Sequence, residues 1–157
     1  MSVSLRVKNS ANLQHLRGPN LSEVLTRFES SDLALFRYRN LAEDQFIAKL
    51  GREELLIRSE IDLSDSLESG QYAFQRGDAM FELSGNWKGL LSEVCIFDFR
   101  QSRPGDFLMV SMAGVSVWML VPEVDKPLVL GCDPTYGHYL LETLQRQIDE
   151  SPFLKME

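Results

Sequence analysis

The histidines and cysteines are the side chains of this sequence best suited to proton transfer, nucleophilic attack or metal binding. His15 and His138 belong to no HxH, HxxxH or HExxH spacing, so a zinc site on either would need carboxylates from distant parts of the chain. A partly exposed structural histidine is favoured over a general acid or base at His138. Cys95 and Cys132 form no CxxC or metal-spaced set, and we expect two buried free thiols in a reducing compartment.

Paired carboxylates could also carry out acid–base chemistry. Acidic residues gather in the middle of the chain: Glu53, Glu54, Glu60, Asp62, Asp65 and Glu68. Their neighbours offer no apolar surroundings that would raise a pKa, so a solvated loop is favoured. The motifs GxGxxG, GxxxxGK[ST] and GxSxG are all missing from the sequence. We therefore predict no catalytic residue, no metal site and no cofactor motif in this chain.

Length and charge narrow the class of protein. The 157 residues fit one domain, and we predict a single domain over residues 1–157 whose first 19 residues form a loosely ordered arm. The net charge of −7 disfavours nonspecific binding to nucleic acid or to anionic membranes. No apolar stretch reaches the roughly 20 residues of a membrane helix, and no hydrophobic block opens the chain, so a cytoplasmic protein is expected.

The first half of the chain predicts helices and strands in alternation. The turn signal at residues 17–20 leads into a helix with an apolar face of Leu21, Val24, Leu25 and Phe28. Asn40 and Glu43 repeat the capping pattern and predict a second helix that ends near Gly51. Strands are predicted at residues 34–39 and 53–61, followed by an exposed loop.

The second half predicts an antiparallel sheet with helices on it. Residues 87–94 form one amphipathic helix, and Asp133 with Pro134 predicts the start of the last one. Strand segments are expected at residues 72–75, 79–83, 107–112, 115–121 and 128–130. Ala113 and Gly114 join two of these strands as a hairpin. The fold class is therefore α+β, with helices packed on an antiparallel sheet.

The predicted hairpin is apolar on both faces. Leu108 and Val110 alternate with Phe107 and Met109, and the second strand repeats the pattern. A sheet with one wet face would instead alternate apolar and polar residues. Either helices cover both faces, or a partner protein covers the second one.

Several weak motifs occur in order over about half of the chain. They are the run from Ala79 to Gly85, the pair Leu90-Leu91, the run from Cys95 to Phe99, Pro104-Gly105, Ala113-Gly114-Val115 and the run from Tyr139 to Leu144. Together they resemble the glycine-cleavage T-protein superfamily, and within it the small gamma subunit family of heterotetrameric sarcosine oxidase. The sequence departs from that pattern at Tyr72–Gln75, where the gamma family often has a Val-Asp-x-Ser step. The Lys-Gly-Cys-Tyr signature of the folate-dependent repair relatives is missing.

The resemblance implies a T-protein-like fold, with a ferredoxin-like βαββαβ order of elements. It also implies a noncatalytic chain that packs on a large flavin- and folate-binding oxidase subunit, in a complex that oxidises sarcosine or another N-methyl amine. On this reading the aromatic and apolar residues of the hairpin meet the partner. The candidates are Phe107, Met109, Trp118 and Leu120.

Two other functions stay open. A stand-alone folate-binding protein of the same superfamily would need a carboxylate to hold the pterin ring, and Glu82 or Asp98 could supply it. Tetrahydrofolate is then the ligand, although this chain is expected to hold no cofactor of its own. A small acidic homodimeric chaperone or adaptor is equally compatible with the composition.

Overall fold

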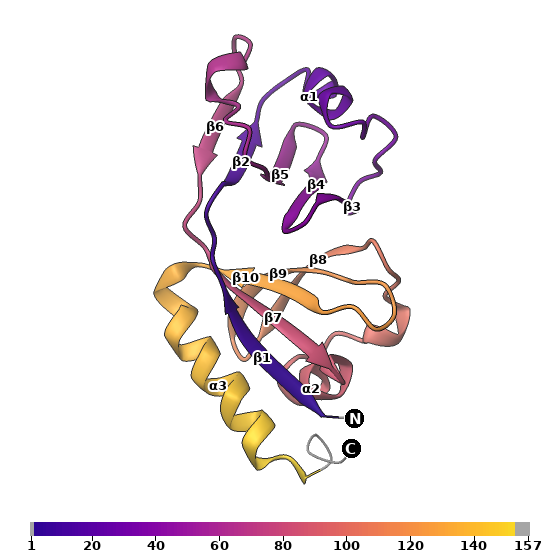
Figure 1. The fold of residues 1–157 in the computed structure, drawn as a ribbon, viewed down its shortest axis with the longest axis vertical. Coiled ribbons are helices and arrows are strands. Elements are labelled where there is room, and N and C mark those ends of the chain that lie inside the picture. Colours follow the sequence, from indigo (N-terminus) through magenta and orange to yellow (C-terminus); the bar gives the residue numbers. More distant parts are fainter. Residues whose placement is uncertain (1, 153–157) are drawn as a thin grey trace. The chain divides into compact units, whose positions relative to one another are not determined.

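The computed structural model describes residues 2–152, and the chain divides into two compact units (Figure 1). Among the described residues, unit 1 contains residues 2–9 and 78–152, and unit 2 is residues 10–77. Each unit has its own five-stranded antiparallel sheet and its own apolar cluster. The sequence predicts one domain over residues 1–157, and within it the structure distinguishes these two units, each with a separate apolar cluster.

Unit 1 is a sheet with two helices. Its strands are β1 (Val3–Lys8), β7 (Ala79–Gly85), β8 (Phe107–Met112), β9 (Val115–Leu120) and β10 (Leu128–Cys132), in the order β1-β7-β10-β9-β8. Its helices are α2 (Trp87–Val94) and α3 (Gly137–Glu150), with the short 3₁₀ turns η2 (Phe99–Gln101) and η3 (Pro134–Tyr136). From β7 onward the elements run βαβββα. The last strand therefore precedes the last helix, whereas the expected βαββαβ order places that strand after it.

Local sequence explains the turns and helix starts of unit 1. Ala113 and Gly114 both have positive φ, of 50° and 82°, which is the two-residue turn that fits the twist of a hairpin. The Asn86 side chain accepts a hydrogen bond from the Gly89 amide over 3.1 Å and begins α2. Asp133 accepts one from the Thr135 amide over 2.8 Å ahead of α3. The hairpin and both helices are therefore confirmed.

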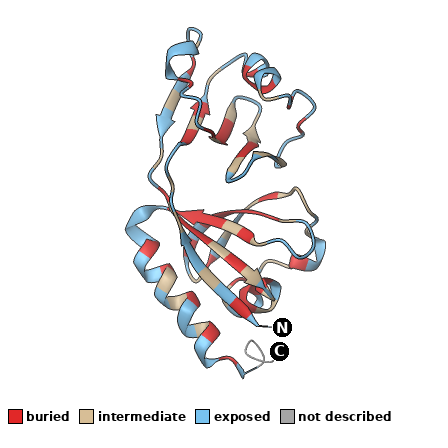
Figure 2. Ribbon diagram, viewed as in Figure 1, coloured by how far each residue is buried: buried red, intermediate tan, exposed pale blue. Residues whose placement is uncertain are grey.

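Both helices pack on the same face of the unit 1 sheet. Leu90 and Leu91 of α2 and Leu140 and Leu144 of α3 belong to one apolar cluster with alternate residues of the five strands. Buried residues recur along α3 and along the strands in Figure 2. The Tyr139 hydroxyl also donates to the Ala113 carbonyl over 2.9 Å and fastens α3 to the hairpin turn.

Unit 2 is a second antiparallel sheet with one short helix. Its strands are β2 (Leu13–Arg17), β3 (Tyr38–Ala42), β4 (Gln45–Gly51), β5 (Glu54–Arg58) and β6 (Tyr72–Gln75), in the order β3-β4-β5-β2-β6. Helix α1 (Ser22–Arg27) places Val24 and Leu25 against Leu16, Ile47 and other residues of the sheet. A 3₁₀ turn, η1 (Ser64–Ser66), lies in the loop before β6.

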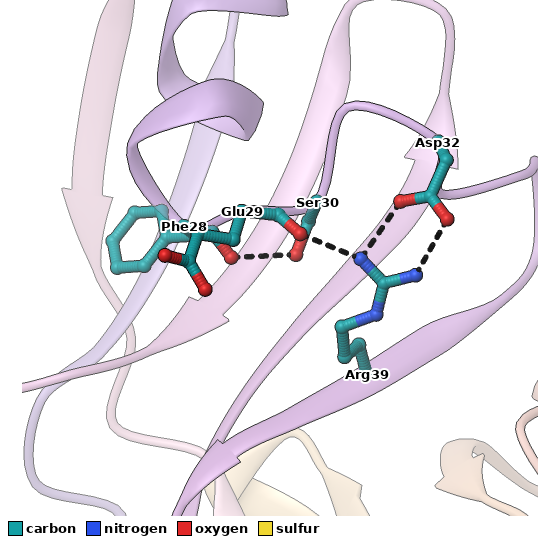
Figure 3. A network of polar contacts seen from close by, with 5 residues as sticks. All are labelled: Phe28, Glu29, Ser30, Asp32 and Arg39. Carbon is teal, nitrogen blue, oxygen red and sulfur yellow. Dashed lines mark hydrogen bonds and ion pairs between the residues drawn. The ribbon is translucent and has the colours of Figure 1, made fainter.

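Arg39 ties the segment after α1 to β3 (Figure 3). Its guanidinium donates to both carboxylate oxygens of Asp32, over 2.9 and 3.1 Å, and to the Glu29 carbonyl over 2.8 Å. Next to it, the Ser30 hydroxyl donates to the Phe28 carbonyl over 2.8 Å. The hydrogen bond from Arg39 holds the pKa of Asp32 below its ordinary value.

Two predicted elements of the first half are wrong. The expected loose arm contains β1 and β2, because residues 3–8 pair with β7 and residues 13–17 pair with β5 and β6. The helix expected after Asn40 is the β3–β4 hairpin, which turns at Asp44 with a φ of 58°. Phe46, Ile47 and Ala48 are all buried, so β4 has two covered faces and shows no strand alternation.

Candidate functional site

Five of the six candidate residues lie on one face of the unit 1 sheet, the face opposite α2 and α3, here called the second face. The strand register defines two rows across it. The first row is Arg6, Glu82, Val129, Leu120 and Phe107. The second row is Lys8, Met80, Gly131, Trp118 and Met109. Residues opposite each other in a ladder share a face, so the sheet brings Glu82 and the four hairpin candidates together and leaves Asp98 out.

Trp118 is held on the second face by three contacts. Its indole Nε1 donates to Oδ2 of the buried Asp78 over 2.8 Å. Its ring stacks on Phe107, with centroids 6.2 Å apart and an interplanar angle of 12°. The indole also lies directly over Gly131, where a Cβ atom would come within 2.3 Å of the ring. Gly131 is therefore the residue that lets this indole cross β10.

The four hairpin candidates differ in accessibility. Phe107, Trp118 and Leu120 are buried within this chain, whereas Met109 is 66% exposed. A side chain that meets a partner must be reachable from outside, and Met109 fulfils this condition directly. Contact between these residues and another protein stays a prediction.

The Glu82 carboxylate already has two cationic partners. Arg6 Nη2 donates to Oε1 over 2.9 Å, and Lys8 Nζ donates to Oε2 over 3.0 Å. The side chain of Glu82 is only 13% exposed. Each oxygen accepts one hydrogen bond from the neighbouring strand β1, so a pterin ring would have to share this carboxylate with Arg6 and Lys8.

Asp98 has a local role in the chain after α2. Its side chain accepts from the Arg100 amide at the start of η2, over 3.1 Å, and forms a two-oxygen ion pair with the Arg100 guanidinium at 2.9 Å. The hydrogen bond from the Arg100 side chain holds the pKa of Asp98 below its ordinary value. Phe99, the next residue, packs into the cluster on the helix side of the sheet, whereas Glu82 points to the second face. The two folate candidates do not converge.

The histidines each meet one carboxylate. His15 Nε2 lies 2.7 Å from Glu54 Oε1, and its Nδ1 lies 3.4 Å from Arg76 Nη1. His138 lies 3.2 Å from Glu142, one turn further along the exposed side of α3. The described contacts of His15 include no hydroxyl or thiol that it could activate as a general base.

The cysteines are buried free thiols, as the sequence predicts. Burial raises the pKa of Cys132, and the nearby carboxylates of Asp78 and Asp133 raise it further. The thiolate, which is the nucleophilic form, is thus disfavoured at Cys132. Among residues 2–152, no group of three or more His, Cys, Asp or Glu side chains is arranged to hold a metal ion.

The acidic residues of the middle segment are spread over the turn before β5, β5 itself and the loop that follows it. Glu54 pairs with His15, and Asp62 accepts from the amide and hydroxyl of Ser64. Glu68 meets the carboxyl of Glu23 instead, and the hydrogen bond and charge repulsion between them raise the pKa of Glu68. Because Glu23 and Glu68 are far apart in the sequence, the spacing of the acidic residues does not predict this exposed pair.

Unit 1 has a cavity of about 430 Å³ where β7 ends and α2 begins. Ser102, Pro104 and the loop at residues 121–127 complete its lining. Lys88 and Lys126 face it, as do Glu123 and Asp125, so its charged groups have both signs. Neither folate candidate lines it.

The sequence interpretation missed the partners of Glu82. Arg6 and Lys8 stand two positions apart, which places both side chains on the same face of a strand. The sequence therefore indicates that Arg6 and Lys8 share a face. Only the pairing of β1 with β7 shows that both side chains reach Glu82.

Two of the solved structures with a similar fold are enzymes. One is a chain of the heterotetrameric sarcosine oxidase from Corynebacterium sp. U-96 in complex with pyrrole 2-carboxylate, with a TM-score of 0.78 at 16% sequence identity over 99% of this chain and 87% of that chain. The other is the glycine cleavage system aminomethyltransferase T from Bartonella henselae, with a TM-score of 0.70 at 11% identity over 91% of this chain and 45% of that chain. This chain has their fold.

The α+β, T-protein-like architecture that the resemblance implies is therefore confirmed. The chain spans less than half the length of the aminomethyltransferase. No protein-family model and no curated protein matches the sequence. Within the described residues 2–152, no helix is both long and apolar enough to cross a membrane.

Proposed function

We propose that this chain is a noncatalytic, gamma-like subunit of a heteromeric oxidase of sarcosine or a related N-methyl amine, linked to folate-dependent one-carbon transfer. The observation that carries the proposal is the likeness of fold over 99% of this chain and 87% of one chain of a heterotetrameric sarcosine oxidase. The two chains are of comparable length, so the likeness extends over nearly a whole chain. A large flavin- and folate-binding subunit would carry out the oxidation, in the cytoplasm, with this chain docked on it.

The chemistry of the candidate residues supports a noncatalytic role. Glu82 is bound by Arg6 and Lys8, Asp98 is bound by Arg100, and the pKa of Cys132 is raised by burial. Each of these groups is engaged in holding the chain together or is kept in its unreactive form. In contrast, Met109 is a large apolar side chain left exposed on an edge strand, which is the kind of residue found at interface centres.

Co-expression with a candidate large oxidase subunit, followed by size-exclusion chromatography, tests the proposal. We expect the two chains to co-elute, and we expect Met109→Glu to weaken the complex by about tenfold or more because it puts a charge into an apolar contact. Val7→Glu is the matched control, since Val7 is 61% exposed on β1 at the opposite edge of the same sheet. Failure to co-elute, with the lone chain running as a monomer, would contradict the proposal.

Stand-alone folate binding is the second candidate, because the fold is also shared with an aminomethyltransferase. Tetrahydrofolate at 100 times its dissociation constant would then add about 2.7 kcal/mol to the free energy of unfolding. Glu82→Gln should remove this stabilisation if Glu82 holds the pterin, with Asp98→Asn measured alongside it. A homodimer that neither responds to tetrahydrofolate nor captures the large subunit would instead indicate a chaperone or adaptor.

A further inference from the structure

Strand β8 is the least protected sheet edge in the described chain. Four strands lie at sheet edges: β1, β3, β6 and β8. Proteins protect such edges with charges, bulges or short strands. Arg6 and Lys8 lie on β1, β3 has a bulge between Asn40 and Ala42, and β6 has only four residues. By contrast, β8 has six residues, no charge, and an unbroken register with β9.

The hairpin geometry fixes which backbone groups of β8 point outward. Met112 and Val115 flank the two-residue turn and exchange both of their hydrogen bonds, and such bonded pairs alternate along the ladder. Leu108 and Val110 therefore bond to β9. The Val121 amide, which donates to the Asp106 carbonyl over 2.9 Å, agrees with this alternation. The N–H and C=O groups of Phe107, Met109 and Ser111 consequently point away from β9, and in the described chain β8 pairs with β9 alone.

The side chains around this edge are apolar and reachable. Met109 is exposed on the second face, and Leu108 and Val110 are only partly buried where they meet the helix-side cluster. The end of α2 lies against the hairpin turn, because the Ala113 amide donates to the Val94 carbonyl over 2.8 Å. Ile96, two residues beyond Val94, is fully exposed.

We propose that β8 is a strand-addition site, and that an extended, apolar, uncharged segment of the large oxidase subunit pairs with the outward groups of Phe107, Met109 and Ser111. This inference rests on the proposed function. The backbone supplies hydrogen bonds and the flanking apolar side chains supply contact area, which is the usual division in strand addition. A second copy of this chain is a poorer occupant because each copy carries a net charge of −7, so two copies repel each other.

Hydrogen exchange of individual amides tests the pairing directly. In the lone chain the amides of Met109 and Ser111 should exchange fast, and those of Leu108 and Val110 slowly. Binding of the large subunit should protect Met109 and Ser111 at least tenfold and leave Leu108 and Val110 nearly unchanged. Unchanged exchange at Met109 and Ser111 in a formed complex overturns the strand-addition site but leaves the proposed function standing.

Substitutions provide an independent readout. Met109→Pro removes an outward N–H without touching the β8–β9 ladder, and proline is tolerated on the outer side of edge strands. It should weaken the complex about tenfold or more, whereas Met109→Leu, which keeps the N–H, should bind like wild type. Ser111→Pro is the second variant if Met109→Pro fails to fold. Equal binding of the large subunit by Met109→Pro and Met109→Leu overturns the inference. A homodimer of the wild-type chain that dissociates when Met109→Pro is introduced also overturns it, because β8 would then bind a second copy. A wild-type chain that never captures the large subunit overturns the proposed function itself.

Discussion

The indole Nε1 of Trp118 donates a hydrogen bond of 2.8 Å to Oδ2 of Asp78, and both side chains are buried. Asp78 is the first residue of unit 1 after the unit boundary and directly precedes β7, while Trp118 lies on β9. The bond therefore crosses β10, which lies between these two strands. It orients the ring that stacks on Phe107.

Asp78→Ala should destabilise the protein by about 1–3 kcal/mol, because it leaves the indole N–H buried without this acceptor. Asp78→Asn keeps an acceptor oxygen and should cost clearly less. Urea denaturation followed by circular dichroism measures both free energies of unfolding. If both variants lost the same free energy of unfolding, the hydrogen bond between Asp78 and Trp118 would not be the source of the lost stability.

Gly131→Ala should destabilise unit 1 by about 1–3 kcal/mol, because the new Cβ would lie 2.3 Å from the Trp118 ring and force the indole to move. A shift in tryptophan fluorescence should accompany the loss. Gly77→Ala is the control, since no atom lies within 4 Å of a Cβ added there. A fluorescence spectrum of Gly131→Ala identical to wild type would argue against the close approach.

Glu82→Ala should cost more stability than Arg6→Ala, although both break the same cluster. The Lys8 side chain is only 7% exposed, so its ion pair with Glu82 is little screened by solvent, and Glu82→Ala also breaks this charge-assisted hydrogen bond, at a cost of about 1–3 kcal/mol. Arg6 is 70% exposed, so its ion pair contributes at most about 1 kcal/mol. Thermal melts at low and high salt separate the two, since only the exposed pair is strongly screened.

Glu68→Gln should raise the melting temperature at neutral pH. The pKa of Glu68 is raised by Glu23, so the pair stabilises the fold below the ordinary glutamate pKa, and this contribution is lost as the pH rises through the raised value. At neutral pH two carboxylates repel each other, and the substitution removes the repulsion. The gain should vanish in acid. Asp65→Asn, a carboxyl in the same loop, serves as the control, and an equal gain from it would count against the Glu23–Glu68 pair.

Local patterns were sufficient for much of unit 1. The helical face of residues 87–94, the Ala113-Gly114 turn and the Asp133-Pro134 start depend on neighbouring residues only, and each is present where the sequence places it. The spacing of Ala42, Phe46 and Leu50, in contrast, fits one face of a helix, while the segment is β3 and β4. Pairing of β4 with β5 and burial of both its faces decided that segment, and neither can be read from a window of a few residues.

The fold class, the hairpin with two apolar faces, and the residue types that could bind or react can all be read from the amino-acid sequence. Three features depend instead on how the chain folds: the division into two units, the binding of Glu82 by Arg6 and Lys8 from 76 and 74 residues away, and the pairing of Asp98 with Arg100. It also decided that Met109 is exposed while Phe107, Trp118 and Leu120 are buried. Charge pairing and burial depend on which strands lie side by side, and contacts between distant parts of the chain set the strand order, so no local pattern contains this information.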